Sequence, residues 1–224
     1  MGGAIAGAYD PVRSAAFRRP FFGTRSLGLL AQQAEVPLSF RSCMAYLMME
    51  RSAQMIRFNF NESKTVETLV IVATLWRGIT PFQVAKVLFF ADRDHLRAYG
   101  RPVTGDMYIA MPHGPVPSRV YDIIKDNLDF FGDPEAIEIN QNHRYPRVYA
   151  KREPNLDLLS ETDVAALNKA VELCKGKSFD ELSSLTHQEP AWFQAPENGV
   201  MDPELLVPDD MREEVRESAA YAVL

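Results

Sequence analysis

Eight of the eleven residues from 66 to 76 are apolar, and they do not recur only at every third or fourth position. A helix that is apolar on all of its sides is buried on all of them. We therefore expect this segment to form a central helix of the fold. Gly78 is placed to end it, because glycine readily takes the left-handed conformation that closes a helix.

The segment that follows carries the signals of a second, amphipathic helix. Thr80 suits the N-cap, Pro81 the first helical position, and Gln83 the reciprocal bond of a capping box. Gly100 is placed to end this helix. The sequence thus predicts a helix over residues 81–99, joined to the first by a short turn.

The rest of the chain alternates between short helical and short extended patterns. The expected elements are a strand at 107–111, a Gly/Pro-rich loop at 113–117, a helix from about residue 117, a β-hairpin of residues 136–140 and 147–151, and helices that begin after Ser160 and Ser178. The expected fold is a mainly helical α+β domain with a small β-hairpin. A helix–turn–helix followed by such a hairpin would also suit a winged helix.

The composition is typical of a compact globular protein. Of 224 residues, 46% are hydrophobic and 10% aromatic, which is enough for a substantial core. The longest strongly apolar and uncharged run, at residues 68–76, is far shorter than the ~20 residues that a membrane-spanning helix needs. Two cysteines cannot make a disulfide framework and indicate a reducing compartment. We expect a cytoplasmic protein with no membrane partner.

Charge is unevenly distributed along the chain. Residues 1–54 contain six arginines and three acidic residues, a net charge of +3, whereas the whole chain carries −6, so residues 55–224 carry −9. An acidic body argues against broad binding to a nucleic-acid backbone, which needs clustered basic residues. It favours a basic protein partner.

Three parts are expected along the chain. They are a poorly ordered N-terminal extension of residues 1–54, a domain of residues 55–195, and an acidic, loosely attached C-terminal tail of residues 196–224 with one further helix at 209–220. The arginine-rich extension also fits an organelle transit peptide. A mis-assigned start at Met48, Met49 or Met55 is the other interpretation of that extension.

One charged residue lies on the apolar side of the second helix. At about 100° per residue, Asp92 falls within a stripe that includes Leu88 and Leu96. An unpaired buried carboxylate is strongly destabilising, so Asp92 must find hydrogen-bond donors. The nearest are the backbone N–H groups of residues 105–118, and we expect Asp92 to hold that loop in shape. A direct role in partner contact or catalysis is the alternative. His95, at the edge of the stripe, is expected to be a hydrogen-bonded helix residue.

Several acidic and histidine side chains could be assembled into a metal-dependent hydrolase site. They are Asp92, Asp94, His95, Asp106 and His113. The spacing argues against this, because Asp92 and Asp94 point about 160° apart on a helix. The Asp-His order is also the reverse of the His-Asp doublet of HD phosphohydrolases. We therefore predict no enzyme, no metal and no cofactor, and keep a hydrolase of phage or plasmid origin only as an alternative.

The loop at residues 113–117 has several rigid positions. Gly114 can take a positive φ, while Pro115 and Pro117 favour an extended chain. A rigid loop loses little entropy on binding, which suits a recognition surface. The same rigidity suits a simple connection, so both interpretations stay open.

A further aromatic cluster follows the last predicted helix. We expect Trp192 to plug one end of the core, with His187 and Glu189 capping the preceding helix. The alternative is an exposed aromatic anchor for a partner, to which Phe179 and Phe193 would contribute.

Five short motifs give a more specific indication. They are Ala-Asp-x-x-His-Leu at 91–96, Tyr-Gly-Arg-Pro at 99–102, Thr-Gly-Asp at 104–106, His-Gly-Pro-Val-Pro-Ser at 113–118 and Leu-Thr-His-x-Glu-Pro-Ala-Trp at 185–192. Together they resemble the Panacea domain, the SocA-like antitoxin domain of bacterial type II toxin–antitoxin systems, over residues 64–195.

The resemblance implies an antitoxin that neutralises a cognate toxin, encoded by an adjacent gene, through direct binding and without catalysis. SocA looks like a proteolytic adaptor that hands its toxin to the ClpXP protease, so such delivery is one implied mechanism. The candidate contact residues are Asp106, His113, Val116 and Arg119. The residues expected to hold the motif together are Asp92, His95, Gly105, Gly114, Pro115, Pro117 and Trp192.

A DNA-binding regulator of a toxin–antitoxin or phage-associated operon is the alternative from another class. It would use Arg93 and Arg97, expected on the exposed side of the second helix, and the basic residues around the hairpin: Arg144, Arg147, Lys151 and Arg152. The acidic body argues against it. Steeply salt-dependent binding to promoter DNA would support it.

Overall fold

The computed structural model describes residues 55–125 and 133–221, which all lie in one of the chain's two compact units, residues 54–224. The expectations for residues 1–54 therefore concern a part of the chain outside the described residues. Helix α2 (Glu62–Leu75) is buried on all sides, as its pattern predicts: Leu69, Val70 and Val72 are each at most 1% exposed.

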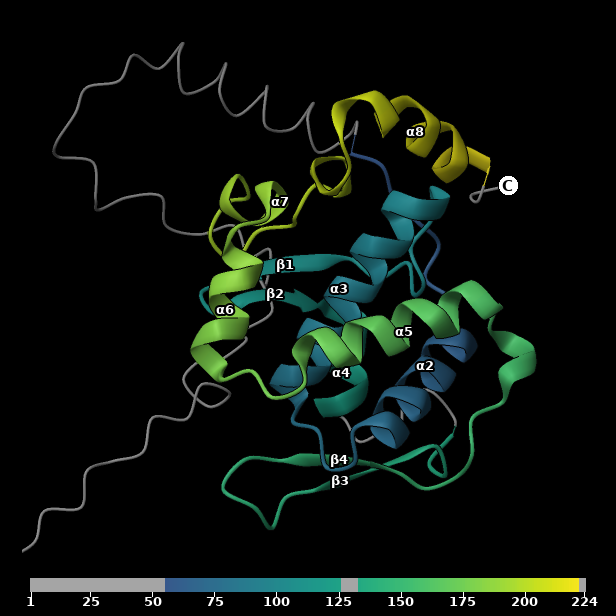
Figure 1. Ribbon diagram of the computed structural model, residues 1–224, viewed down its shortest axis with the longest axis vertical. Coiled ribbons are helices and arrows are strands. Elements are labelled where there is room, and N and C mark those ends of the chain that lie inside the picture. Colours follow the sequence, from purple (N-terminus) through teal and green to yellow (C-terminus); the bar gives the residue numbers. More distant parts are fainter. Residues whose placement is uncertain (1–54, 126–132, 222–224) are drawn as a thin grey trace, which may run out of the picture. The chain divides into compact units, whose positions relative to one another are not determined.

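Helix α3 (Pro81–Tyr99) has the predicted ends. Thr80 and Gln83 form the capping box, and Gly100 closes the helix in the left-handed conformation with a φ of 67°. Its main neighbour is α5 (Glu161–Cys174), which also contacts α2, and the three helices form the centre of the fold (Figure 1). The capping box at the start of α5 joins Ser160 to Asp163.

Strands β1 (Tyr108–Met111) and β2 (Gly114–Pro117) form an antiparallel hairpin, in which Tyr108 faces Pro117 and Met111 faces Gly114. The expectation of a loop at residues 113–117 is therefore wrong. Proline cannot donate to a strand ladder and so weakens the local signal of a strand, but it is tolerated where the strand has no further partner on that side.

The free side of β1 is paired as well, by a segment far away in sequence. Met201 donates its backbone N–H to the Tyr108 carbonyl at 2.9 Å, and Ile109 and Val200 form an antiparallel bridge. Strand β1 therefore lies between β2 and residues 198–201, which holds it on both sides.

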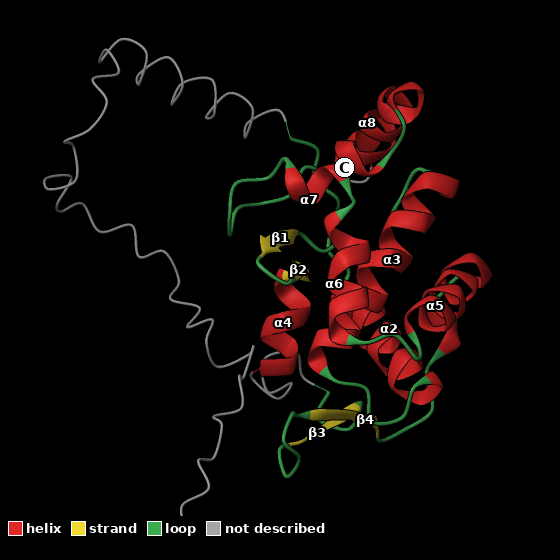
Figure 2. Cartoon of the chain, turned by 60° about the vertical axis from the view of Figure 1, so that its left-hand side comes forward, coloured by secondary structure: helices red, strands yellow, loops and turns green. Residues whose placement is uncertain are grey.

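The remaining elements surround this centre. They are α4 (Ser118–Lys125), β3 (Ile137–Asn140), β4 (Arg147–Ala150), the 3-10 turn η1 (Leu156–Leu158), α6 (Phe179–His187) and α7 (Pro190–Phe193). Figure 2 shows the two strand pairs, in yellow, as separate small sheets among the helices. The predicted hairpin at 136–151 and the predicted mainly helical α+β fold are confirmed. No helix in the described ranges is long and apolar enough to cross a membrane.

The prediction of a loosely attached tail is wrong for the residues that follow 195. This segment comprises η2 (Pro203–Leu206), η3 (Asp209–Met211) and α8 (Arg212–Tyr221). Met201, Leu206 and Val215 are at most 5% exposed, because they pack into the main core. The acidic composition was misleading: Glu204 is itself nearly buried and pairs with Arg216.

Candidate functional site

Asp92 anchors the loop that leads from α3 into β1. It is 2% exposed and accepts hydrogen bonds from the backbone N–H groups of Val103 and Thr104, at 2.9 and 2.8 Å. The hydroxyls of Thr104 and Tyr108 donate to its second oxygen. Burial raises the pKa of the Asp92 carboxyl, although these four donors oppose the shift. The bonds reach residues 103, 104 and 108, so most of them precede the segment 105–118 to which the sequence pointed.

Asp106 fixes the start of α4 in a similar way. Its carboxylate accepts the backbone N–H groups of Met107, Arg119 and Val120, at 2.7, 3.1 and 2.9 Å. Burial raises the pKa of Asp106 to about 6. Both carboxylate oxygens are thus bonded within the chain, and they tie the entry of β1 to the helix that follows β2.

Gly105 lets residues 59–61 lie against this loop. Its φ is +72°, and a side chain there would collide with the backbone carbonyl of Asn59. The backbone N–H of Asn61 reaches the Thr104 carbonyl at 3.4 Å. The loop is therefore held from both sides, by α3 and by the segment before α2.

The turn end of the hairpin encloses a buried lysine. Lys86 is 1% exposed, donates to the Pro115 carbonyl at 3.1 Å, and lies 4.9 Å from the centre of the Phe82 ring. Burial lowers the pKa of Lys86 to about 7. The sequence reasoning missed it, but a signal was present, because Phe82 and Phe90 lie four residues before and after Lys86 on the same helix side.

Replacing Lys86 with methionine should remove a pH dependence of stability. The pKa is about 7 in the folded chain and about 10.4 in an unfolded one. Between these values the unfolded chain binds more protons, so the free energy of unfolding should rise with pH, by about 3 kcal/mol from pH 7 to 10. Methionine keeps the apolar stem and cannot titrate.

Urea unfolding followed by tryptophan fluorescence over this pH range tests the prediction. The profile of Lys86→Met should be flatter than that of the wild type, whereas Lys175→Met, at an exposed lysine, should run parallel to the wild type. Parallel profiles for all three proteins would show that Lys86 keeps an ordinary pKa.

The four predicted contact residues do not form one cluster. Asp106 and Arg119 meet at the start of α4, Val116 lies half-buried in the middle of β2, and His113 lies in the turn at the other end of the hairpin. The His113 ring packs edge-on against Phe179, with 4.9 Å between the ring centres. Arg119 is exposed, and its guanidinium group lies 5.9 Å from the centre of the Phe60 ring.

His95 is a buried structural residue in this geometry. It is 1% exposed, and its Nδ1 lies 2.7 Å from the Arg101 carbonyl while its Nε2 lies 3.0 Å from the Thr162 hydroxyl. Burial lowers the pKa of His95, which favours the neutral ring. The side chain therefore joins the end of α3 to the start of α5.

Trp192 closes the turn end of the hairpin. Its indole N–H donates to the Met111 carbonyl at 3.0 Å, and its ring stacks on His187 with 3.7 Å between the ring centres. The expectation that Glu189 caps the preceding helix is wrong. Its carboxylate does not cap the preceding helix but binds Arg93 and Arg97 of α3, at 2.5 and 2.9 Å.

The basic residues that a DNA-binding regulator would use are mostly paired within the chain. Arg93 and Arg97 were expected on the exposed side of α3, but both are half-buried and paired with Glu189, the N-cap residue of α7. Three of the basic residues around the β3–β4 hairpin are engaged too: Arg147 with the Gly78 carbonyl, Lys151 with Glu135, and Arg152 with Glu67 and Asp133. Arg144 lies over the Tyr145 ring.

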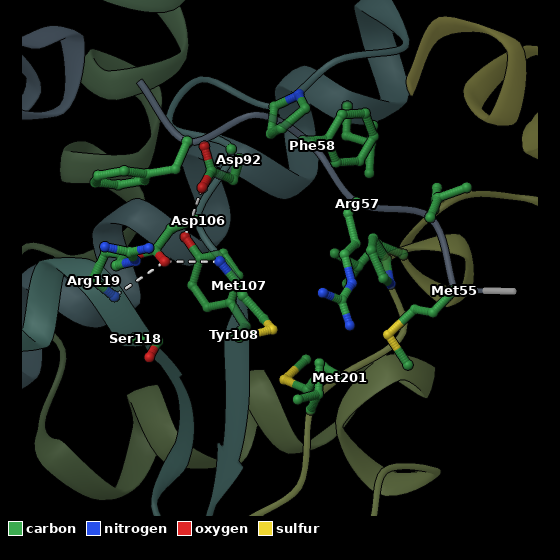
Figure 3. A pocket seen from close by; sticks show the side chains of 18 residues that line it. Met55, Arg57, Phe58, Asp92, Asp106, Met107, Tyr108, Ser118, Arg119 and Met201 are labelled. Atoms are coloured by element: carbon green, nitrogen blue, oxygen red, sulfur yellow. Dashed lines mark hydrogen bonds between the residues drawn. The ribbon is translucent and has the colours of Figure 1, made fainter. Parts of the chain in front are cut away.

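A pocket of about 300 Å³ opens beside the Asp106 corner (Figure 3). Its walls come from four segments, residues 55–60, 102–108, 118–119 and 200–206, with Asp92 and Leu96 behind them. Among the residues that the structure describes, no group of three or more His, Cys, Asp or Glu side chains could hold a metal ion. The sequence reasoning missed this pocket, because two of its four walls lie outside the motifs.

A comparison with protein families finds a match that covers most of the residues that hold this hairpin. Residues 84–193 match the family model described as antitoxin SocA-like, Panacea domain. No curated protein and no solved structure matches the chain. The match contains α3 from residue 84 onward, the β1–β2 hairpin, the Asp92 and Asp106 anchors and Trp192. Residues 84–193 of the chain are therefore similar to the SocA-like Panacea domain of antitoxins.

Proposed function

We propose that this protein is an antitoxin that neutralises a cognate toxin, encoded by an adjacent gene, by binding it directly. The observation that carries the proposal is the family match over residues 84–193, which spans the whole anchored hairpin. An antitoxin family implies a toxin partner in general. The complex would form in the cytoplasm, as the cysteine content led us to expect.

The rigidity of the hairpin supports this role. Asp92 holds the entry to β1, Asp106 ties that entry to α4, and Trp192 holds the turn end. A surface that is already ordered loses little conformational entropy on binding. Next to it, Met107 and Phe193 leave 44% and 57% of their surface exposed, which offers apolar contact area.

The four residues proposed to contact the toxin differ in how accessible their side chains are. Arg119 and His113 present side chains at the two ends of the hairpin, and Val116 lies between them. Asp106 would contribute shape, since its oxygens are bonded to backbone N–H groups. The net charge of −9 on residues 55–224 would speed the encounter with a basic toxin by electrostatic steering.

Two finer mechanisms are compatible with binding. Delivery of the toxin to ClpXP adds a protease to the complex, whereas simple inhibition does not. The DNA-binding alternative has less support, because five of the six basic side chains it would use are bonded to acidic groups or carbonyls of this chain.

Expression of the neighbouring gene tests the proposal. Its product should arrest growth when expressed alone, growth should return when this chain is co-expressed, and the two proteins should purify as a stable complex. Toxin levels in cells with and without ClpXP then separate an adaptor, which lowers them, from an inhibitor, which does not. A harmless neighbour that forms no complex would contradict the proposal, and salt-dependent binding to the chain's own promoter would then favour the regulator.

A further inference from the structure

The walls of the pocket beside Asp106 come partly from the family-matched domain and partly from the segments that flank it. Residues 102–108 and 118–119 belong to the family-matched domain, whereas residues 55–60 and 200–206 lie outside residues 84–193. The two outer segments are firmly seated, through the bond from Met201 to the Tyr108 carbonyl and through the contact of Asn59 with Gly105. A shared hairpin thus carries a pocket whose other half is supplied by the flanks of this particular chain.

The pocket is apolar at its mouth and lined with methionine. Met55, Met107 and Met201 come from three different segments and lie around the same opening (Figure 3). Methionine is flexible and polarisable, so such a lining adapts to an apolar side chain of irregular shape. At about 300 Å³, the volume is at the lower end of the range for ligand sites. It suits one or two side chains of a partner better than a whole folded element.

The cationic groups of the pocket are hydrogen-bond donors and have no charged partner among the described residues. Both oxygens of Asp106 accept backbone N–H groups, and Asp92 is saturated behind it. By contrast, the guanidinium groups of Arg57 and Arg119 pair with no carboxylate among the described residues. Figure 3 shows the Arg57 side chain pointing into the pocket toward Met201. A ligand that matches this arrangement supplies an acceptor, and a guanidinium group binds a carboxylate best.

We propose that this pocket receives an apolar side chain of the toxin together with a neighbouring carboxylate, which Arg57 binds. The inference rests on the proposed antitoxin function and names the chemistry that the partner brings to it. In a body of net charge −9, the unpaired guanidinium group of Arg57 is a local exception. A basic toxin is steered by the body as a whole, and this pocket accepts one of its carboxylates. The pocket therefore sets which toxin fits, rather than how fast it arrives.

The test uses the full chain and the purified product of the neighbouring gene. Arg57→Ala should weaken the complex about 10- to 100-fold, the range expected for one lost hydrogen-bonded charge pair. Arg77→Ala is the matched control, because Arg77 is also exposed and unpaired within the described residues but lies in the turn between α2 and α3. It should leave the dissociation constant unchanged.

Methyl-labelled methionine gives an independent readout of the pocket. The chain has nine methionines, and Met107→Leu and Met201→Leu assign the two signals of interest. Both signals should shift when unlabelled toxin binds. A capped Gly-Phe-Asp-Gly peptide at millimolar concentration should shift them more than its Gly-Phe-Asn-Gly counterpart.

The possible outcomes separate the pocket inference from the antitoxin function. A tight complex with unchanged methionine signals, and with Arg57→Ala binding as tightly as the wild type, would overturn the pocket inference and leave the antitoxin function in place. Equal shifts by the Asp and Asn peptides would show that the pocket does not recognise a carboxylate. The absence of any complex would overturn the antitoxin function and the pocket inference together.

Discussion

Gly114→Ala should destabilise the protein by about 3 to 5 kcal/mol, from backbone strain and overpacking together. Gly114 has a φ of +95°, which a residue with a side chain rarely adopts. A Cβ atom built there collides with the Thr186 hydroxyl and lies 2.7 Å from the Lys86 ammonium nitrogen. Both neighbours are buried, so neither can move aside without disturbing the core. Urea unfolding at pH 7 measures the loss.

Gly176→Ala is the control that separates strain from crowding. Gly176 also has a positive φ, +82°, but nothing lies within 4 Å of a Cβ built there. It should therefore show only the backbone cost, about 1 kcal/mol. Equal losses at the two glycines would show that the core around Lys86 and Thr186 relaxes freely, contrary to the geometry.

Asp92→Ala should destabilise the protein by about 3 to 5 kcal/mol, because it removes the acceptor of four buried hydrogen bonds at once. The backbone N–H groups of Val103 and Thr104 and the hydroxyl of Tyr108 would be left without it in a buried setting. Urea unfolding gives the total effect. Amide hydrogen exchange at residues 103 and 104 should also speed up more than exchange in α5, which locates the effect in the loop.

Asp94→Ala provides the comparison on the same helix. Asp94 pairs with Arg93 and Lys169, and its side chain is 20% exposed. Surface ion pairs of this kind contribute about 1 kcal/mol or less, so the variant should be nearly as stable as the wild type. If Asp92→Ala were equally mild, the carboxylate would not be what holds the loop, and a role in partner contact would regain weight.

Local signals predicted the helices well. The capping boxes at Thr80, Ser160 and Ser178 all form where the sequence places them, and Gly100 ends α3. These features depend on hydrogen bonds between residues three or four apart, so the residue types in a short window are enough to predict them. The same holds for the burial of Asp92, which follows from its position in an apolar helical stripe.

Contacts between distant segments decided the rest. Residues 113–117 form a strand because Tyr108–Met111 lies beside them, and residues 198–201 join the same sheet across almost a hundred residues of chain. The partner of Arg93 and Arg97 is Glu189, and the cover over Lys86 is the turn of a hairpin. No local pattern encodes such pairings, because each depends on which elements pack together.

The sequence by itself therefore determined where the helices begin and end, which of them is central, and which family motif the chain carries. Only the tertiary structure decided that the acidic C-terminal segment is part of the core, that Arg93 and Arg97 of α3 pair with Glu189, and that a pocket exists beside Asp106. The physical reason is the separation in sequence between the residues that interact. Capping and periodicity are properties of neighbouring residues, whereas pockets, ion-pair partners and strand edges arise when segments from different parts of the chain meet.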